Sequence, residues 1–458
     1  MPDASDTIFA LSSGRPPAAI AVVRVSGPRA GAALEAVIGR VPEPRRATFA
    51  RMRDPSTGEM VDEGLALWFP GPKSETGEDT AELQLHGGRA VIAAALSALA
   101  SVPGLRPAEA GEFTRRAFEN GRLDLTRVEG LADLIYADTE VQRRQAYRQL
   151  RGMLGDRAER WRTTLIETIA LVEASIDFSD EGDVPSNTLH PALQAAQLLR
   201  AEIVHALADS HRGERLRDGL VVAIAGSVNV GKSSLLNRIA RRDAAIVSPL
   251  AGTTRDIIEV HLDLNGYPVT LLDTAGIRPS VDPIEQEGVR RALERASAAD
   301  LVLWVVDISA GQKLVLDDPT LQFSQTPRWL VVNKVDLVAA QNRDWVMSLV
   351  PHAGDRLISI SAKTGEGLDE LLEKLTEYAR NYLGSAEPAL VTRQRQRHAL
   401  EDAATALSRA VEEGKSNGRE DIVAEELRLA ARSLGRLTGR VDVEDILDVI
   451  FRDFCIGK

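Results

Sequence analysis

Gly226-Ser227-Val228-Asn229-Val230-Gly231-Lys232-Ser233 is the stretch that decides the fold of this 458-residue chain. It matches the Walker A pattern, follows the apolar run 220–225 and precedes the helix-forming run 234–239. That order of strand, glycine-rich loop and helix is the context that the motif requires. The pattern therefore predicts a P-loop, in which backbone N–H groups and a helix N-terminus surround phosphate oxygens.

Two side chains of this loop have expected roles on a nucleoside triphosphate. Lys232 should bridge the β- and γ-phosphates, and the Ser233 hydroxyl should bind Mg²⁺. The bland alternative is an accidental glycine-rich turn. Two later elements argue against it: Gly252-Thr253-Thr254 can close over Mg²⁺ through Thr254, and Asp273-Thr274-Ala275-Gly276 can hold the outer metal shell and the γ-phosphate.

Base selection is predicted from two further elements that each follow an apolar run. Asp336, in Asn333-Lys334-Val335-Asp336, can accept two N–H groups from the Watson–Crick edge of guanine. Adenine offers only one there, so this element selects GTP. Ser361-Ala362-Lys363 supplies the last base-contacting loop. Five elements in the right order predict a GTPase domain.

The residues alone do not decide which side chain orients the attacking water. Small GTPases of the Ras kind use a glutamine just after the Asp-x-x-Gly element, and Ile277 stands there in this chain. Glu285 and Glu287 are both candidates. Arg255 could be an arginine finger or a surface charge, and a fixed monovalent cation could do the same electrostatic work.

The length and composition limit the number of domains, the class of protein and its partners. The length suggests roughly three domains, and 44% hydrophobic with 27% charged residues is typical of a soluble globular protein. With a net charge of −12, a nucleic-acid partner must meet a local basic patch. Cys455 is the one cysteine, the N-terminus is acidic, and the apolar run 90–102 is too short to span a bilayer. We expect a cytoplasmic protein with no membrane contact.

Hydrophobic periodicity predicts the order of the domains. The run 19–25 and the alternating run 81–85 indicate strands, and 90–100 indicates a helix. Leu165, Ile169, Val172 and Ile176 lie on one helical stripe. A second stripe comprises Leu400, Ala404, Leu407 and Val411. The predicted architecture is a P-loop α/β G domain inserted into an all-α helical domain, preceded by a small α/β domain. The expected boundaries are 1–119, 120–216 and 384–458 for the outer parts, with the G domain at 217–383.

The whole chain resembles the MnmE (TrmE) family of tRNA modification GTPases, of the TrmE-Era-EngA-like group. The runs that carry the resemblance, besides the GTPase elements, are 21–28, Thr76-Gly77-Glu78-Asp79, 82–88 and the ending Phe454-Cys455-Ile456-Gly457-Lys458. The terminal Cys-Ile-Gly-Lys combined with an inserted G domain is highly specific, whereas the GTPase motifs alone fit many relatives.

The resemblance implies a tetrahydrofolate-binding N-terminal domain that also forms a homodimer. It implies a heterotetramer or larger complex with an FAD-dependent partner, MnmG, and tRNA as substrate. The implied reaction modifies carbon five of the wobble uridine with a one-carbon unit from 5-formyl- or 5,10-methylene-tetrahydrofolate. The product carries an aminomethyl or carboxymethylaminomethyl group.

Residue roles follow from the same resemblance. It implies a potassium site at Asn229, Ser248, Leu250 and Thr253, and it assigns Glu285 as the catalytic glutamate. The folate contacts implied are Arg24, Glu82, Arg122 and Lys458, with Arg122 standing where the family has a lysine. A planar guanidinium is no isostere of an ammonium. Cys455 has a chemical role and a buried structural role as open alternatives.

Motifs and resemblance together give one set of expected GTP contacts. These are Asn229, Val230, Gly231, Lys232, Ser233, Ser234, Ser248, Pro249, Leu250, Ala251, Gly252, Thr253, Thr254, Asp273, Thr274, Ala275, Gly276, Asn333, Lys334, Asp336, Ser361, Ala362 and Lys363.

A basic stretch, 141–162, holds seven arginines and two acids, with Tyr147 and Trp161 interleaved. A solvated helix face is the default interpretation, and a tRNA-phosphate contact is the functional one. Two other function classes stay open: a GTP-dependent RNA or ribosome-assembly switch without base chemistry, and a folate enzyme acting on small molecules.

Overall fold

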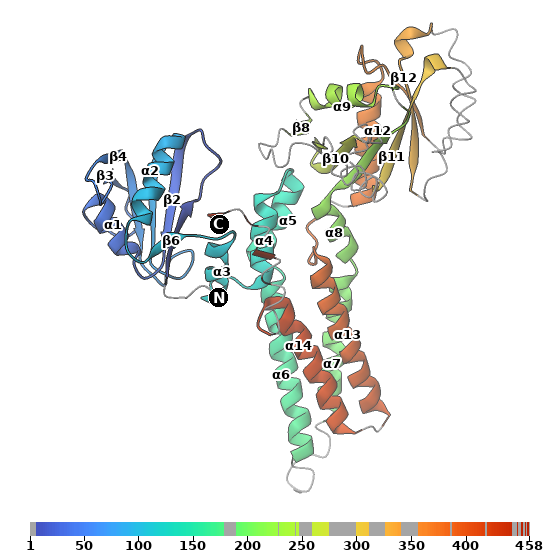
Figure 1. Cartoon of the computed structure of the whole chain (residues 1–458). Helices are drawn as coiled ribbons and strands as arrows, with labels where there is room; N and C mark the ends of the chain where they lie inside the picture. The colour runs from blue at the N-terminus through green and yellow to red at the C-terminus, as the bar shows by residue number, and fades with distance from the viewer. Residues whose placement is uncertain are drawn as a thin grey trace, which may run out of the picture. The chain divides into compact units, whose positions relative to one another are not determined.

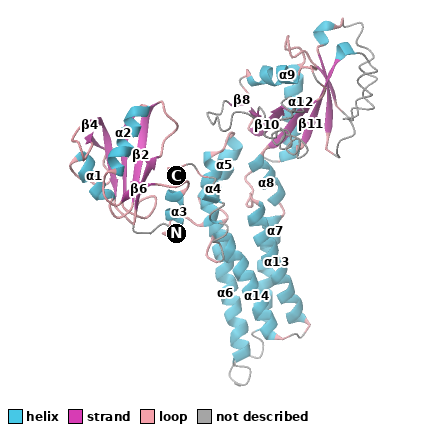
Figure 2. Ribbon diagram, in the orientation of Figure 1, coloured by secondary structure: helices cyan, strands magenta, loops and turns pink. Residues whose placement is uncertain are grey.

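The computed structural model describes residues 6–177, 189–227, 229–242, 244–246, 259–273, 299–310, 326–339, 356–384, 387–416, 419–441, 447, 450–451, 454 and 456–457. They belong to two compact units, shown with their elements in Figures 1 and 2. The first unit comprises Met1–Ala132, Gln149–Ile203 and His398–Lys458, and the second comprises Asp133–Arg148 and Val204–Arg397.

The first unit begins with a six-stranded sheet in the order β3-β4-β5-β2-β1-β6. Its strands are β1 (Thr7–Leu11), β2 (Ala18–Ser26), β3 (Thr48–Arg53), β4 (Met60–Phe69), β5 (Thr80–Gly87) and β6 (Leu105–Pro107). All pairings are antiparallel except β1 with β6. Helices α1 (Ala30–Ile38) and α2 (Arg89–Ala100) share one core with alternate residues of the strands, such as Val23 and Leu83. The strands and helix expected here are confirmed.

Helices from both ends of the chain complete the first unit. They are α3 (Glu112–Glu119), α4 (Leu125–Ile135), α6 (Gly155–Asp177), α7 (Leu189–Leu207), α13 (Gln394–Lys415) and α14 (Glu420–Thr438). Helices α6 and α14 pack together over much of their length (Figure 1). The Ser12 hydroxyl donates to the Gly457 carbonyl at 2.7 Å, and Ala110 forms a β-bridge with Ile456. The prediction that helices before and after the G domain pack together is therefore confirmed.

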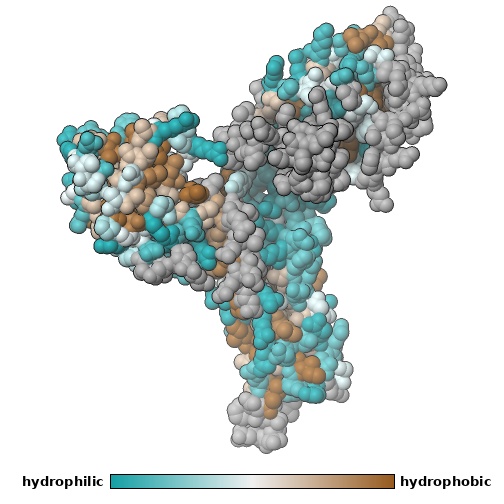
Figure 3. All heavy atoms as spheres, viewed as in Figure 1, coloured by the Kyte–Doolittle hydropathy of each residue, from teal (hydrophilic) through white to brown (hydrophobic). Residues whose placement is uncertain are grey.

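The helical stripes are amphipathic as predicted. Leu165 and Val172 are fully buried, as are Leu400 and Leu407. The opposite faces are solvated, and single apolar residues such as Leu198 are exposed among them. Figure 3 shows small hydrophobic areas among hydrophilic ones on the visible surface. Among the described residues, no helix is both long and apolar enough to cross a membrane.

The second unit contains a seven-stranded sheet in the order β13-β12-β11-β7-β10-β9-β8. Its strands are β7 (Leu220–Ala225), β8 (Ala245–Ile246), β9 (Glu259–Leu264), β10 (Tyr267–Asp273), β11 (Leu301–Asp307), β12 (Arg328–Asn333) and β13 (Leu357–Ser359). The five strands from β13 to β10 are parallel, and β9 and β8 continue antiparallel. Their continuous apolar runs are buried, which is typical of a parallel sheet covered on both faces.

Four helices of the second unit pack around this sheet or beside it. They are α5 (Glu140–Leu150), α8 (Ser210–Asp218), α9 (Lys232–Ala240) and α12 (Leu368–Leu383). Val141 of α5 and Leu216 of α8 belong to the same hydrophobic core as the strands. Two short 3₁₀ turns, η2 (Ile308–Ala310) and η4 (Val335–Leu337), follow strands β11 and β12. The exact domain boundaries expected at 119/120, 216/217 and 383/384 stay a prediction.

The two ends of the inserted sheet domain meet. The Arg215 guanidinium of α8 lies 5.1 Å from the centre of the Tyr382 ring, near the end of α12. The Tyr382 hydroxyl donates to the Asp300 carboxylate, whose second oxygen accepts the Val221 N–H at 2.9 Å. One cluster therefore joins the helix before β7, the first residues of β7 and the last helix of the domain.

Candidate guanine-nucleotide site

The loop between β7 and α9 has a backbone that needs its glycines. A Cβ on Gly226 would lie 2.2 Å from the Val305 carbonyl oxygen, and one on Gly231 would lie 2.3 Å from Asn333 Nδ2. Gly231 also has φ of 102°, and Asn229 has φ of 65°. Asparagine is one of the few side chains that adopt this left-handed region readily. The sequence thus permits the tight curl that a phosphate cradle requires.

Lys232 begins helix α9 and closes the cradle. Its ammonium donates to the carbonyls of Gly226 at 2.7 Å and Ser227 at 2.8 Å. Burial lowers the pKa of Lys232, and the nearby Asp273 carboxylate partly opposes that effect. The ammonium group therefore lies inside the loop that the sequence predicts to bind the phosphates.

Ser233 and Asp273 meet on the metal side of the loop. The Ser233 hydroxyl donates to Asp273 Oδ2 at 2.9 Å. Strands β7 and β10 are parallel neighbours, so Asp273 at the end of β10 lies at the same sheet edge as the P-loop. A hydroxyl and a carboxylate are oxygen ligands of the kind that Mg²⁺ prefers. These two predicted site residues are brought together by the fold.

Asn333 connects the base-binding loops with the phosphate cradle. Its Nδ2 donates to the Val230 carbonyl at 2.8 Å, and its Oδ1 accepts the Ala362 N–H at 2.9 Å. Asn333 is almost completely buried at the end of β12. One side chain therefore fixes the P-loop against the 361–363 loop, which makes the three elements one rigid site.

The carboxylate of Asp336, which the sequence predicts to recognise the base, is exposed and held by a hydrogen bond. The Ser361 hydroxyl donates to Asp336 Oδ1 at 2.6 Å. Lys334 has φ of 65°, and its ammonium lies 2.6 Å from Asp307 Oδ2. Burial alone would raise the pKa of Asp307, but hydrogen bonds from Lys334 and Ser309 outweigh it, so that pKa is lowered.

Asp307 is a site residue that sequence reasoning missed. It ends β11, the strand between those that carry the P-loop and Asn333. The available signal was an acid at the carboxyl end of an apolar run, in the same position that Asp273 has on its own strand.

Many predicted site residues lie outside the described residues, and their roles stay predictions. They are Ser248, Pro249, Leu250, Ala251, Gly252, Thr253, Thr254, Thr274, Ala275, Gly276, Glu285, Cys455 and Lys458.

Three of the four expected folate contacts are described. Arg24 and Glu82 face each other across β2 and β5 and form a half-buried ion pair at 2.9 Å. Arg24 also lies 2.6 Å from a Glu75 carboxylate oxygen. Arg122 lies beside the same loop as Glu75, since a Cβ on Gly77 would come within 3.3 Å of its Cγ. The fold brings Arg24 and Glu82 together and puts Arg122 next to the loop that contacts Arg24.

The basic stretch 141–162 divides into two kinds of surface. Helix α5 exposes Arg143, Arg144, Tyr147 and Arg148, and Glu140 pairs with the first two arginines. Trp161 is 3% exposed and its Nε1 donates to Glu202 at 2.9 Å. Trp161 therefore belongs to the helix packing and is not an exposed aromatic of a nucleic-acid contact.

A P-loop joined to an Asn-Lys-x-Asp element and a serine-alanine loop defines a guanine-nucleotide-binding P-loop GTPase. Two family descriptions match nearly the whole chain: "MnmE helical domain" over residues 125–455 and "GTP-binding protein TrmE N-terminus" over residues 7–122. The chain belongs to the MnmE family of tRNA modification GTPases.

Two relatives support this membership over the full length. The tRNA modification GTPase MnmE of Bradyrhizobium sp. (strain ORS 278) is 57% identical over 452 residues, covering 99% of each chain. That of Rhodopseudomonas palustris is 56% identical over 460 residues, covering 100% of each. The solved G domain of the T. maritima FeoB iron transporter is 30% identical, with a TM-score of 0.27, and covers 35% of this chain and 98% of its own.

Proposed function

We propose that this chain couples GTP hydrolysis to modification of carbon five of the tRNA wobble uridine. The observation that carries the proposal is the described part of a guanine-nucleotide site, from the P-loop to Asp336 and Ser361, in a chain that is 57% identical, over 99% of both lengths, to a tRNA modification GTPase. The one-carbon unit would come from 5-formyl- or 5,10-methylene-tetrahydrofolate. We propose the four parts 1–119, 120–216, 217–383 and 384–458 as the functional domains.

In this proposal the P-loop residues divide the work on GTP. Lys232 would leave its carbonyl partners for the β- and γ-phosphates and stabilise the charge that develops on them. Ser233 and Thr254 would hold Mg²⁺, whose charge neutralises the transferred phosphoryl group. Asp336 would accept the two N–H groups of guanine, while Ser361 fixes the direction of its carboxylate.

We further propose that K⁺ replaces an arginine finger, bound by Asn229, Ser248, Leu250 and Thr253, and that Glu285 orients the attacking water. Asn229 supports this because its exposed side chain stands on a backbone turn of the cradle itself.

The test of the potassium site compares GTP hydrolysis by the full chain in KCl and in NaCl. We expect a rate at least about tenfold higher in KCl, in line with the loss of a single electrostatic stabiliser. Asn229→Ala should remove that difference. Asn265→Ala is the matched control because Asn265 also has positive φ, 56°, but lies in the β9–β10 turn. Equal rates in both salts for the unaltered chain would refute the potassium site.

The folate site is proposed at Arg24, Glu82, Arg122 and Lys458, in a homodimer that works with the FAD-dependent MnmG. Supporting it is the half-buried Arg24–Glu82 pair, whose charges can turn toward the polar ring and the glutamate tail of a folate. Titration of the full chain with 5-formyl-tetrahydrofolate should saturate. Arg24→Gln should weaken that binding and leave GTP hydrolysis unchanged.

The alternative function is a GTP-dependent RNA or ribosome-assembly switch without base chemistry. Mass spectrometry of tRNA nucleosides from a deletion strain separates the two functions. Missing wobble-uridine modification that the wild-type gene restores supports the proposal, and unaltered nucleosides support the switch.

A further inference from the structure

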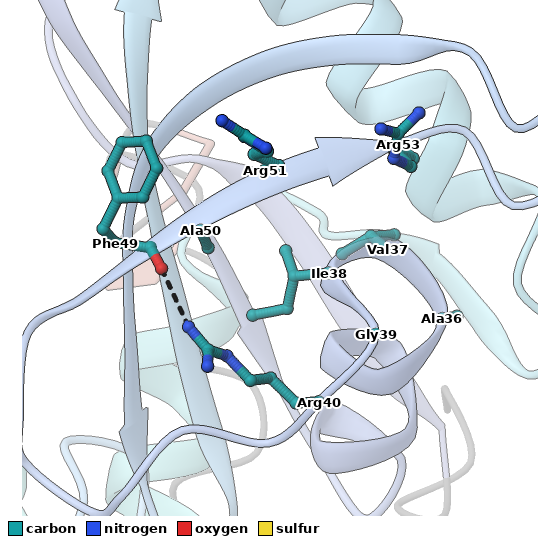
Figure 4. Close-up of a pocket in the computed structure, with 9 residues that line it drawn as sticks. All are labelled: Ala36, Val37, Ile38, Gly39, Arg40, Phe49, Ala50, Arg51 and Arg53. Carbon is teal, nitrogen blue, oxygen red and sulfur yellow. Dashed lines mark hydrogen bonds between the residues drawn. The ribbon is translucent and has the colours of Figure 1, made fainter.

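A basic cavity opens at the β3 edge of the N-terminal sheet. It has a volume of about 630 Å³ and lies between the end of α1 and strand β3. Arg40, Arg51 and Arg53 line it together with Phe49. Figure 4 shows Arg40 reaching from the end of α1 to the Phe49 carbonyl, while the Phe49 ring and the Arg51 side chain extend from the other side of the strand. These four residues are called the β3 groove here.

The charge of the β3 groove is largely uncompensated. Arg40 donates to the Phe49 carbonyl at 3.0 Å and Arg53 to the Gly58 carbonyl at 3.1 Å, so both keep their positive charge beside neutral partners. Arg51 pairs with Glu63 at 2.7 Å, but both side chains are about half exposed or more. Exposed pairs of this kind bind weakly and exchange partners easily. None of the residues that line the cavity is acidic.

The spacing of the groove fits a chain of phosphates. Every second residue of β3 points to the same face of the sheet, and these residues are Phe49, Arg51 and Arg53. Neighbouring members of this set are about 7 Å apart along the strand. Successive phosphates of a nucleic-acid strand repeat at a comparable distance. Phe49 is 56% exposed, and an exposed aromatic ring beside arginines is a stacking platform that accepts any base.

We propose that the β3 groove binds the sugar-phosphate backbone of tRNA, with an unpaired base stacked on Phe49. The inference rests on the proposed function and adds to it a place where the RNA contacts the N-terminal domain. A polyanion approaching a chain of net charge −12 needs a local basic surface. Arginines on an edge strand can have a different role, which is to prevent the strand from pairing with another chain. That role does not require Arg40 or an exposed phenylalanine.

The experiment measures binding of a fluorescently labelled, unmodified tRNA transcript to the full chain over a series of KCl concentrations. The variant Arg51→Gln with Arg53→Gln should lower the affinity and reduce the slope of log K against log salt by about 1.4–1.8, the loss of two phosphate contacts. Phe49→Leu should lower affinity about tenfold with little change in slope. Arg46→Gln is the matched control, because Arg46 is 73% exposed and paired with Glu43 but does not line the cavity.

The possible outcomes distinguish a failure of the β3 groove from a failure of the proposed function. If the slope of log K against log salt is unchanged in the double variant, or changes equally in Arg46→Gln, the proposed RNA site at the β3 groove is wrong. In that case, tRNA binding by the unaltered chain still supports the proposed function. No tRNA binding by the unaltered chain, alone and with its flavoprotein partner, defeats the proposed function itself. Loss of a protein partner with tRNA binding intact would assign the groove to an acidic protein surface and overturn the RNA proposal. GTP hydrolysis should be unchanged in all three variants, which verifies that they fold.

Discussion

Asp336 and Ser361 are joined by a hydrogen bond of 2.6 Å from the serine hydroxyl to one carboxylate oxygen. Asp336 belongs to the turn after β12, and Ser361 belongs to the loop after β13. The bond holds an exposed carboxylate in one direction before any base arrives. Preorganisation of this kind reduces the entropy that ligand binding must overcome.

Asp336→Asn should change which nucleotide the site accepts. An amide cannot accept both guanine N–H groups, so GTP affinity should fall by at least about 100-fold, the loss of charge-assisted hydrogen bonds. XTP carries a carbonyl in place of the guanine amino group and should bind the variant better than GTP does. Titration with fluorescent GDP and XDP analogues measures both. Ser361→Ala should give a smaller loss without a switch of base, and a variant that still prefers GTP would contradict this assignment.

Gly231→Ala should abolish nucleotide binding by distorting the cradle. The added methyl group would lie 2.3 Å from Asn333 Nδ2, a side chain fixed by bonds to Val230 and Ala362. Gly266→Ala is the control, with φ of 91° but only the tip of Val141 nearby at 3.1 Å. Calorimetric titration with GDP should show binding in the control and none in Gly231→Ala. Normal binding in both would mean that Asn333 can move without cost.

Glu112→Gln should remove a pH-dependent stabilisation of the N-terminal domain. Burial alone would raise the pKa of Glu112, but hydrogen bonds from Arg106, the Glu109 N–H and Arg116 outweigh it and lower the pKa below its ordinary 4.5. A lowered folded-state pKa stabilises the fold above pH 4.5, and that contribution is lost as the pH falls through the folded value.

Hydrogen exchange in peptides from β6 and α3 measures this effect. Exchange in Glu112→Gln should be faster than in the unaltered chain at pH 7, corresponding to about 3 kcal/mol for a broken buried pair. The difference should shrink toward pH 3. Glu119→Gln removes an exposed partner of Arg115 and should change little at either pH.

Tyr382→Phe should weaken the cluster at the two ends of the G domain. Burial raises the pKa of the Tyr382 hydroxyl, and its bond to Asp300 raises it further, so the group stays a donor. Its removal should destabilise the domain by about 1 kcal/mol and leave GDP affinity within about twofold. Thermal unfolding with and without GDP measures both quantities. Tyr378→Phe keeps the ring that stacks on Tyr382 and is the comparison variant.

The nucleotide site was predictable because its chemistry is local in sequence. The Walker A loop must follow one strand, and Asp273 and Asn333 must end two others, so parallel pairing alone brings all three to one edge. The insertion of the G domain into the helical domain was also predictable from the sequence. Helical apolar stripes occur both before and after the run of buried strands.

Side-chain pairing across the chain was not predictable. Asp307 pairs with Lys334, which follows the neighbouring strand, and its place at the end of an apolar run does not by itself name that partner. Trp161 stands among arginines in the sequence, but its ring is buried in the helix packing and its Nε1 donates to Glu202 on another helix. Such contacts depend on helix rotation and strand register, which hydrophobic periodicity fixes only approximately.

The meeting of Arg215 with Tyr382 has an evolutionary consequence. Because the residues that lead into the sheet domain lie against those that leave it, the whole GTPase behaves as a cassette with its connections at one point. Gly384, which follows α12, also lies beside the helix that leads in, since a Cβ on it would come within 3.0 Å of the Arg212 Cδ. A single insertion at this point is enough to add the GTPase domain to a helical protein.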